Sequence, residues 1–95
     1  MGEKPRVSVI LPVYKAEQYI RRCIEGLINQ DCEFDFEIIM VNNNSPDQSA
    51  NIIGEYPGIK LLSETKQGAY AARNMGSRAA LGDILVFTDP DCVHR

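Results

Sequence analysis

Four short, nearly continuous apolar runs alternate with longer helical patterns along this chain, and this alternation limits the folds it can adopt. The runs lie at residues 7–11, 35–41, 59–62 and 83–88. Nearly continuous apolar runs of about four to six residues are typical of strands that are covered on both faces. We therefore expect four buried strands, the first of which stops at Pro12.

The segments between the runs carry helix signals. Over residues 16–29 the apolar side chains recur in one stripe at helical spacing. Residues 45–48 predict a helix start, with the serine as N-cap, the proline in the first turn and the glutamine closing a capping box. This second helix should end near Glu55. A third helix is predicted over about residues 69–81, with Gly82 as its left-handed C-cap.

The resulting order, β-α-β-α-β-α-β, predicts the α/β class. We expect a Rossmann-like, three-layer α/β/α arrangement around a mostly parallel four-stranded sheet. The length of 95 residues leaves room for a single domain, residues 1–95. Such sheets bind ligands outside the carboxyl ends of their strands. Because polar clusters follow every predicted strand, at residues 12–15, 42–45, 63–68 and 89–91, we expect one site at one rim.

Composition argues against several partners and locations. Thirteen carboxylates against ten lysines and arginines give a net charge of −3, and no basic block exists to contact a phosphate backbone. We therefore do not expect nucleic acid as a partner. No uncharged apolar run approaches the roughly 18 residues of a membrane span, so no transmembrane segment is expected. The three cysteines are odd in number and lack metal-type spacing, so we do not expect a disulfide framework. A reducing cytoplasm is therefore the expected location, with peripheral attachment to the inner face of the membrane as an alternative.

Asp89-Pro90-Asp91, after the fourth run, is the sharpest chemical signal in the sequence. Two carboxylates two residues apart at a strand end can point the same way, and their hard oxygens suit Mg²⁺ or Mn²⁺. Such a metal neutralises a diphosphate, including one that departs as a leaving group. A solvated acidic turn is the alternative, since Asp and Pro are common turn formers.

Three other rim features each have a binding interpretation and a structural one. Tyr14 can stack a base or another ring, or it can close the core as a half-buried side chain. The three asparagines at residues 42–44 can pair with a base edge, or they can form a loop that precedes a capped helix. Arg73 can reach a phosphate near a helix N-terminus, or it can be a solvated surface side chain. Spacing alone does not choose between these interpretations.

Taken together, four motifs in order resemble the family 2 glycosyltransferases of the GT-A fold. The motifs occupy residues 7–15, 37–47, 68–76 and 87–91, nearly the whole chain. The resemblance implies half of a GT-A domain that binds a nucleoside-diphosphate sugar, usually with a uridine nucleotide. It also implies a divalent metal, Mn²⁺ or Mg²⁺, and inversion at the transferred sugar.

The resemblance also implies a set of nucleotide-sugar contacts: Pro12, Val13, Tyr14, Glu17, Asn43, Arg73 and Asp89. Within this set Tyr14 would lie against the base ring, and Asn43 would read the base edge. Asp91 would hold the metal on the diphosphate, while Asp89 would face the ribose and share the metal. Glu17 is the weaker member of the set.

The second motif departs from the family pattern. The family commonly has Val-Asp-Asp or Val-Asp-Asn after the second strand, and this chain has Val41-Asn42-Asn43. An amide oxygen still accepts from a base N–H, but it forfeits charge assistance worth roughly 1 kcal/mol. The identity of the base therefore stays open.

The sequence runs only four residues past Asp91, to Arg95. In the family the acceptor-binding half and the general base follow the acidic motif, and the base must lie within hydrogen-bond reach of the acceptor hydroxyl. We therefore expect the general base downstream of Arg95 and assign no catalytic residue within this chain.

We therefore expect this chain to form a donor half-site that is not catalytically active by itself. The full-length enzyme would bind the acceptor, which is a glycan, a lipid or another molecule. The alternative is a non-catalytic nucleotide-binding or interaction module. An uncovered sheet edge would favour a homodimer.

Overall fold

The computed structural model describes residues 5–29 and 36–88, which form a four-stranded sheet and three helices. The elements in chain order are β1 (Val7–Val13), α1 (Ile20–Ile28), β2 (Phe36–Asn42), α2 (Ser49–Ile53), β3 (Ile59–Ser63), α3 (Ala69–Ala79) and β4 (Ile84–Phe87). All three strand pairs are parallel, and the order across the sheet is β3-β2-β1-β4. Within the described residues, no helix is long and apolar enough to cross a bilayer.

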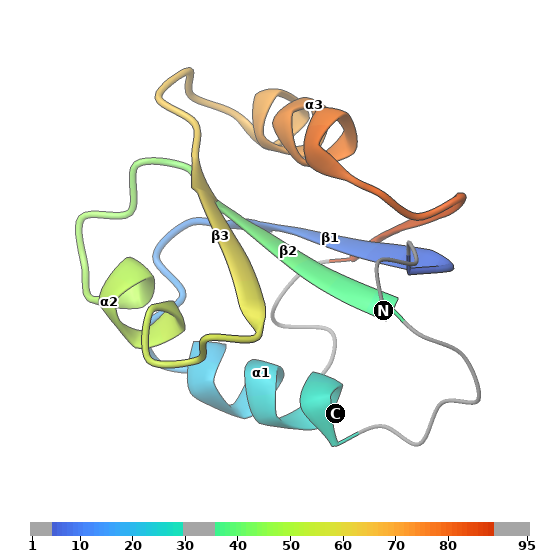
Figure 1. The fold of residues 1–95 in the computed structure, drawn as a ribbon. Coiled ribbons are helices and arrows are strands. Elements are labelled where there is room, and N and C mark those ends of the chain that lie inside the picture. Colours follow the sequence, from blue (N-terminus) through green and yellow to red (C-terminus); the bar gives the residue numbers. More distant parts are fainter. Residues whose placement is uncertain (1–4, 30–35, 89–95) are drawn as a thin grey trace.

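The helices cover the sheet from both sides, as Figure 1 shows, with α3 on one face and α1 and α2 on the other. Two separate apolar cores result. The larger core joins α1 and α2 to the side chains of one sheet face, including Leu11 and Met40. The smaller core packs α3 against the opposite face, through Ile10, Ile39 and Ala72. The predicted three-layer α/β/α fold with a parallel sheet is therefore confirmed.

The strand order reverses at β1. From β1 the chain moves outward to β2 and β3 with its helices on one face. It then returns through α3 on the other face and adds β4 on the far side of β1. In open α/β sheets, ligands bind at the carboxyl ends of the strands where the order reverses in this way. The topology therefore points to the carboxyl end of β1 as the centre of a site.

The first strand does not stop at Pro12, as the sequence predicted, but runs on to Val13. The Ile10 carbonyl accepts from the Thr88 amide, just after β4, and the Val13 carbonyl accepts from the Asn43 amide, just after β2. Backbone groups alternate between the two sides of a strand, so those of Pro12 face β4. Pro12 lies two residues past Ile10, which forms the last pair of that ladder with Phe87. Proline has no N–H with which to extend the ladder with β4. The ladder with β2 does not use the nitrogen of residue 12 and therefore runs on to Val13.

The second helix is shorter than predicted, and its cap was misassigned. Its N-cap is Gln48, and no side chain caps the helix. The Asp47 carboxylate, just before the N-cap, accepts from the Ser49 amide at 3.0 Å and the Ser49 hydroxyl at 2.6 Å. The Ser45 hydroxyl instead accepts from the Lys15 amide at 3.1 Å and donates to the Val13 carbonyl at 3.3 Å. A tertiary contact with the β1 loop has displaced the local cap.

Gly82 is not a left-handed C-cap. Helix α3 ends at Ala79, its cap Ala80 is extended, and Gly68 is the one described glycine with a positive φ. Gly82 instead lies against β1, where an added Cβ would come within 2.8 Å of three atoms of Val7 and Ser8. A close backbone approach is therefore the reason for glycine here.

The fourth strand departs from the prediction that every strand is covered on both faces. Its four residues are 39–49% exposed, although all of them are large and apolar. Within the described part of the chain β4 is an edge strand that pairs only with β1, while α3 packs over β1 and β2. The described residues therefore leave the apolar side chains of β4 partly exposed.

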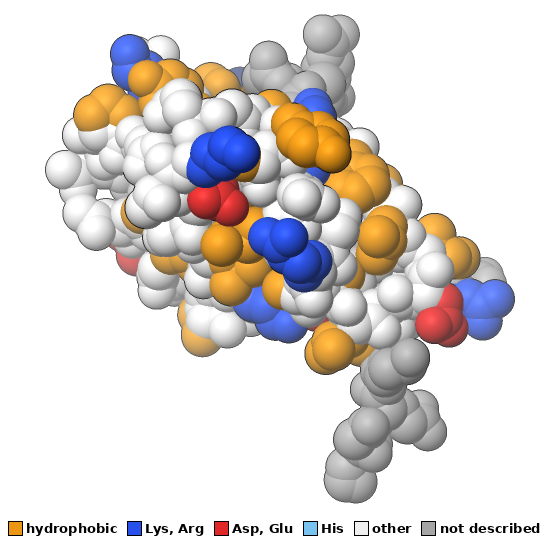
Figure 2. Space-filling model, turned by 90° about the horizontal axis from the view of Figure 1, so that it is seen from above, with side chains coloured by type: hydrophobic (Ala, Val, Ile, Leu, Met, Phe, Trp, Pro, Cys, Tyr) orange, Lys and Arg blue, Asp and Glu red, His pale blue; other side chains and the backbone are white. Residues whose placement is uncertain are grey.

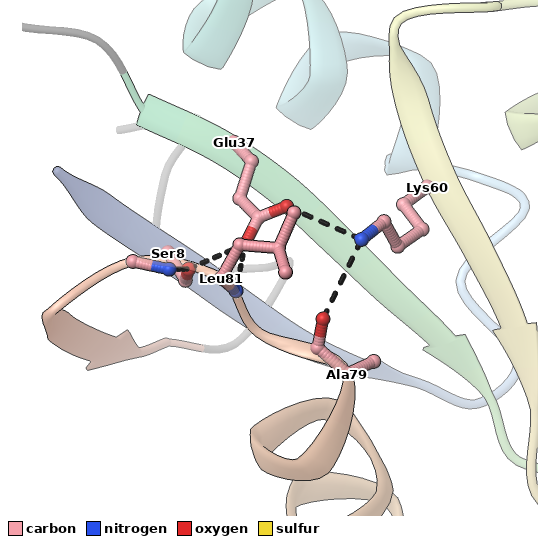
Figure 3. A network of polar contacts seen from close by, with 6 residues as sticks. Ser8, Glu37, Lys60, Ala79 and Leu81 are labelled. Atoms are coloured by element: carbon pink, nitrogen blue, oxygen red, sulfur yellow. Dashed lines mark hydrogen bonds and ion pairs between the residues drawn. The ribbon is translucent and has the colours of Figure 1, made fainter. Parts of the chain in front are cut away.

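A polar network fixes the amino end of the sheet, opposite the rim (Figure 3). The carboxylate of Glu37 on β2 accepts from the Ser8 hydroxyl and from the Leu81 amide at 2.7 Å, and it lies 3.4 Å from the Lys60 ammonium. The Gly82 amide donates to the Ser8 hydroxyl at 2.8 Å. Burial of the carboxyl by itself raises the pKa of Glu37. The hydrogen bonds and the nearby ammonium outweigh burial and hold this pKa below its usual range.

Candidate functional site

The carboxyl edge of the sheet, which we call the rim, comprises the segments that follow the strands. Backbone bonds extend the ladders past the strand ends, from the Asn43 amide to the Val13 carbonyl at 2.8 Å and from the Glu64 amide to the Asn42 carbonyl at 2.9 Å. The first three predicted polar clusters are therefore brought together at one edge.

The fourth polar cluster, with Asp89 and Asp91, lies outside the described residues. Arg95, downstream of which the general base is expected, lies outside them too. The predicted metal ligands and the predicted position of the general base therefore stay predictions.

The segment after β1 offers an aromatic ring at the rim. Tyr14 is 47% exposed, and the Lys15 ammonium lies 5.4 Å from the centre of its ring. Lys15 has a φ of 53°, a left-handed conformation that turns the chain sharply away from the strand. Val13 is fully buried and Pro12 partly so. Of these predicted contacts, Tyr14 therefore presents the most surface to a ligand.

Glu17 joins the β1 loop to the start of α2. Its carboxylate accepts from the Gln48 amide at 2.9 Å, and its own amide donates to the Asp47 carboxylate at 3.3 Å. Hydrogen bonding from the Ser49 hydroxyl holds the pKa of Asp47 below its usual range. The Ser49 hydroxyl is fully buried and also accepts from the Ala16 amide at 2.9 Å. The carboxylate of Glu17 thus has protein partners in a loop-to-loop contact.

Asn43 is 4% exposed, and its amide group is satisfied by the loop that follows β3. Its Nδ2 donates to the Glu64 carbonyl at 2.9 Å and to the Lys66 carbonyl at 2.8 Å, and its Oδ1 accepts from the Gly68 amide at 2.9 Å. The reverse orientation would point Oδ1 at two carbonyl oxygens, so the network fixes the amide. Both N–H donors of Asn43 are therefore committed within the protein.

The neighbouring asparagines make different contacts. The Asn42 Oδ1 accepts from the Ser45 amide at 3.1 Å. Asn44 has a left-handed φ of 66°, and its Nδ2 donates to the Thr65 carbonyl and the Gln67 side chain, each at 2.9 Å. The loop before α2 is therefore bound to the loop before α3 at several points, and each asparagine has its own partners.

Helix α3 begins at the rim, directly after Gly68. Gly68 has a φ of 121°, and no side chain caps the helix there. Tyr70 is 80% exposed on the first turn. Arg73 is partly buried on the second turn, and among the described residues no hydrogen bond or ion pair engages its guanidinium. Figure 2, which views the molecule from the α3 side, shows basic and hydrophobic side chains exposed on this face.

Two shallow surface pockets flank the rim. One is lined by Lys15, Glu17, Gln18, Pro46 and Asp47. The other lies beside the start of α3 and is lined by Glu64, Lys66, Gln67, Tyr70, Ala71, Asn74 and Arg78. Of the predicted contacts, Glu17 lines the first pocket. Tyr70 and Asn74, which lie on the first two turns of α3 with Arg73, line the second. Residues 5–29 and 36–88 contain no group of three or more His, Cys, Asp or Glu side chains that could hold a metal ion.

Sequence reasoning missed the two residues that fix the rim loops from within, Gly68 and Ser49. Gly68 stands directly before an apolar helical pattern, which is a signal for a special backbone conformation. The role of Ser49 was missed because the Ala16 amide, which donates to its hydroxyl, belongs to a residue 33 positions away.

The sequence model of glycosyl transferase family 2 matches residues 8–95, nearly the whole chain. The chain belongs to this family. Among curated family relatives, EpsH of Bacillus subtilis (strain 168), which is named as a glycosyltransferase, is 42% identical over 93 residues. That alignment covers 94% of this chain and 27% of EpsH.

Solved glycosyltransferase structures share the fold. The crystal structure of S. aureus TarS 1-349 in complex with UDP has a TM-score of 0.82 and 31% identity, covering 90% of this chain and 27% of that chain. The mannosyltransferase PcManGT from Pyrobaculum calidifontis, in complex with GDP-Man and Mn²⁺, has a TM-score of 0.79 and 28% identity, covering 95% of this chain and 28% of that chain. The chain spans about a quarter of the length of the curated relatives it matches.

Proposed function

We propose that this chain is the nucleotide-sugar-binding portion of an inverting family 2 glycosyltransferase and that it binds a UDP-sugar through a divalent metal. The observation that carries the proposal is the gathering of three family motifs at one rim, beside the point where strand order reverses. Structural neighbours bound to UDP and to GDP-Man with Mn²⁺ support a nucleoside diphosphate as the ligand class.

The proposed donor site places Tyr14 against the base, because its ring is the exposed aromatic group at the end of β1. Arg73 is proposed to lie near the nucleotide, since its guanidinium has no ion pair within the described residues. Pro12 and Val13 support Tyr14 from the strand. Asn43 and Glu17 stay in the proposed set, although both side chains already have protein partners.

The proposed metal site is Asp91 with Asp89. Thr88, the residue before them, lies beside β1, with its amide donating to the Ile10 carbonyl at 3.1 Å. Two carboxylates suit a hard divalent cation, Mn²⁺ or Mg²⁺, whose remaining positions are filled by water and diphosphate oxygens. When bound, such a cation neutralises the diphosphate.

We further propose that residues 1–95 act as one domain and that the whole enzyme transfers the sugar to a glycan, a lipid or another acceptor. The acceptor would then be held by residues other than the ones described, and the general base would come from residues downstream of Arg95. A cytoplasmic location and a homodimer stay predictions.

Calorimetric titration of this chain with UDP, with and without Mn²⁺, tests the proposal. We expect metal-dependent binding that Asp91→Ala abolishes. Asp83→Ala is the matched control, because Asp83 is an exposed acid at the opposite end of β4. It should bind UDP as the unmodified chain does. If neither UDP nor GDP binds in the presence of metal, or if Asp91→Ala binds normally, the proposed donor site is wrong.

A further inference from the structure

The pocket beside the start of α3 is a groove that none of the described nucleotide contacts lines. We call it the α3 groove, and it is lined chiefly by Glu64, Lys66 and Gln67 of the β3–α3 loop (residues 64–68) and by Tyr70, Asn74 and Arg78 of the helix. Its volume is about 290 Å³, close to the lower limit of roughly 300 Å³ for small-ligand sites. A groove of this size suits a short part of a longer chain.

Tyr70 gives the groove an apolar surface. It is the most exposed large hydrophobic side chain of the described residues, at 80%, and no described side chain stacks on its ring. A single exposed aromatic residue needs no explanation by itself. Here, however, the ring lines a groove among polar groups. The face of an aromatic ring carries partial negative charge, so it attracts the C–H groups of a ligand that has an apolar face and polar edges.

The helix side of the groove is a row of three residues. Tyr70, Asn74 and Arg78 follow one another at intervals of four and therefore lie on one face of α3. From first to last the row spans about 12 Å at a rise of about 1.5 Å per residue. Within residues 5–29 and 36–88, no side-chain hydrogen bond or ion pair engages Asn74 or Arg78. An uncommitted amide and guanidinium thus follow the ring along a row longer than one sugar ring.

The loop side of the groove is held by its own hydrogen bonds. The Glu64 carboxylate accepts from the Lys66 amide at 2.9 Å, and the Gln67 side-chain oxygen accepts from the Asn44 Nδ2 at 2.9 Å. The second carboxylate oxygen of Glu64 and the NH₂ group of Gln67 keep their hydrogen-bonding capacity. A wall that is ordered before the ligand arrives lowers the entropic cost of binding.

This combination of groups matches the chemistry of a glycan. Each sugar hydroxyl both donates and accepts, and each sugar ring has a C–H face, so an oligosaccharide can use both the polar groups and the ring. An acyl chain would instead leave the polar groups without partners, which costs free energy. Two cations, Lys66 and Arg78, face one carboxylate, Glu64. The excess of positive charge favours a glycan that carries acidic groups.

We propose that the α3 groove binds a glycan chain with acidic groups, with Tyr70 against a sugar ring and Arg78 paired with an acidic group. The groove begins at the β3–α3 loop, on the rim, and follows α3 away from it. In the whole enzyme it would hold part of the acceptor. That role rests on the proposed function, whereas glycan binding by the groove needs neither nucleotide nor metal. Figure 2 looks onto the α3 side of the molecule.

The experiment is an NMR titration of this chain, labelled with nitrogen-15, with three probes. Oligogalacturonate, which has a carboxylate on every sugar, should bind with a dissociation constant in about the millimolar range and shift the amides of residues 64–78. Neutral maltohexaose should bind more weakly, because it offers no charge to Lys66 and Arg78. Hexaglutamate, an acidic peptide, should also bind more weakly than oligogalacturonate, because it has no sugar face for Tyr70.

Four variants separate the ring from the charge. Tyr70→Leu keeps an apolar side chain and removes the ring, so it should weaken oligogalacturonate by about three- to tenfold. Tyr70→Phe keeps the ring and should stay within about twofold. Arg78→Gln should weaken oligogalacturonate and leave maltohexaose nearly unchanged. Arg22→Gln, at an exposed position of α1 on the other face of the sheet, is the matched charge control and should bind as the unmodified chain does.

Three results would overturn the inference: no shift in the groove with either oligosaccharide at about 20 mM, unchanged oligogalacturonate binding by Tyr70→Leu, or hexaglutamate binding as tightly as oligogalacturonate. Titration of the same chain with UDP and Mn²⁺ tests the proposed function separately. Glycan binding without UDP binding refutes the proposed function, and the acceptor role with it, but leaves the glycan site standing. UDP binding without glycan binding refutes the inference alone.

Discussion

Replacing Gly82 by alanine should destabilise the fold through a collision with the backbone of β1. The new Cβ would lie 2.8 Å from the Ser8 amide nitrogen, the Ser8 hydroxyl and the Val7 carbonyl carbon. Two of these atoms are backbone and cannot rotate away. Overpacking of this kind costs about 1–3 kcal/mol. The shift would also weaken the 2.8 Å bond from the Gly82 amide to Ser8, worth about 1 kcal/mol.

We therefore expect Gly82→Ala to lower the free energy of unfolding by about 2–4 kcal/mol. Urea unfolding followed by circular dichroism measures this, with an unchanged dependence on urea. Gly58→Ala is the matched control, since a Cβ at Gly58 meets nothing within 4 Å. It should be neutral or stabilising, by about 0.4–1 kcal/mol, because it restricts the unfolded chain.

A third variant separates steric contact from the helix-cap role that the sequence suggested. In a left-handed C-cap, asparagine is tolerated better than alanine. In a close approach, the larger Gly82→Asn should cost at least as much as Gly82→Ala. The reasoning is refuted if Gly82→Ala stays within about 0.5 kcal/mol of the unmodified chain, or if asparagine restores stability.

Two further predictions concern polar groups that fix the loops and the sheet. Because the folded-state pKa of Glu37 is lowered, its contribution to stability is present above its ordinary pKa and is lost as the pH falls through the folded value. Glu37→Gln should therefore cost about 1–3 kcal/mol near neutral pH and flatten the acid side of the stability profile, and an unchanged profile would contradict this. Ser49→Ala leaves the buried Ala16 amide without its acceptor, so thermal unfolding should show a loss of about 1–3 kcal/mol, whereas the exposed Asn51→Ala should show little.

The strands and helices were predicted from the sequence because each depends on neighbouring residues. The apolar runs gave the four strands to within two residues at each end, and the pattern over residues 69–81 gave α3 within two residues. Helix α1 begins at Ile20, four residues after the start of the stripe over residues 16–29. The errors fell where a distant partner competed with a local signal. Ser45 failed to cap α2 because the β1 loop uses its hydroxyl. Pro12 stayed within β1 because its nitrogen faces β4, so the pairing of β1 with β2 continues without it.

The candidate site was predicted as a location more accurately than as a set of contacts. Parallel strands end at one edge, so polar residues after each strand meet there whatever their partners are. The contacts themselves depend on the loop paths. The sequence could not show that Asn43 turns inward to the β3–α3 loop, nor that Glu17 accepts from the start of α2.

By itself the sequence determined the order of elements, the parallel sheet, the rim and the family, because these follow from patterns that recur over a few residues. The tertiary structure alone decided what the individual rim and loop residues do. The amide of Asn43 meets partners 21–25 positions away, and the Gly82 amide meets one 74 positions away. Such pairs form only when the sheet brings separate segments together, so no local pattern encodes them.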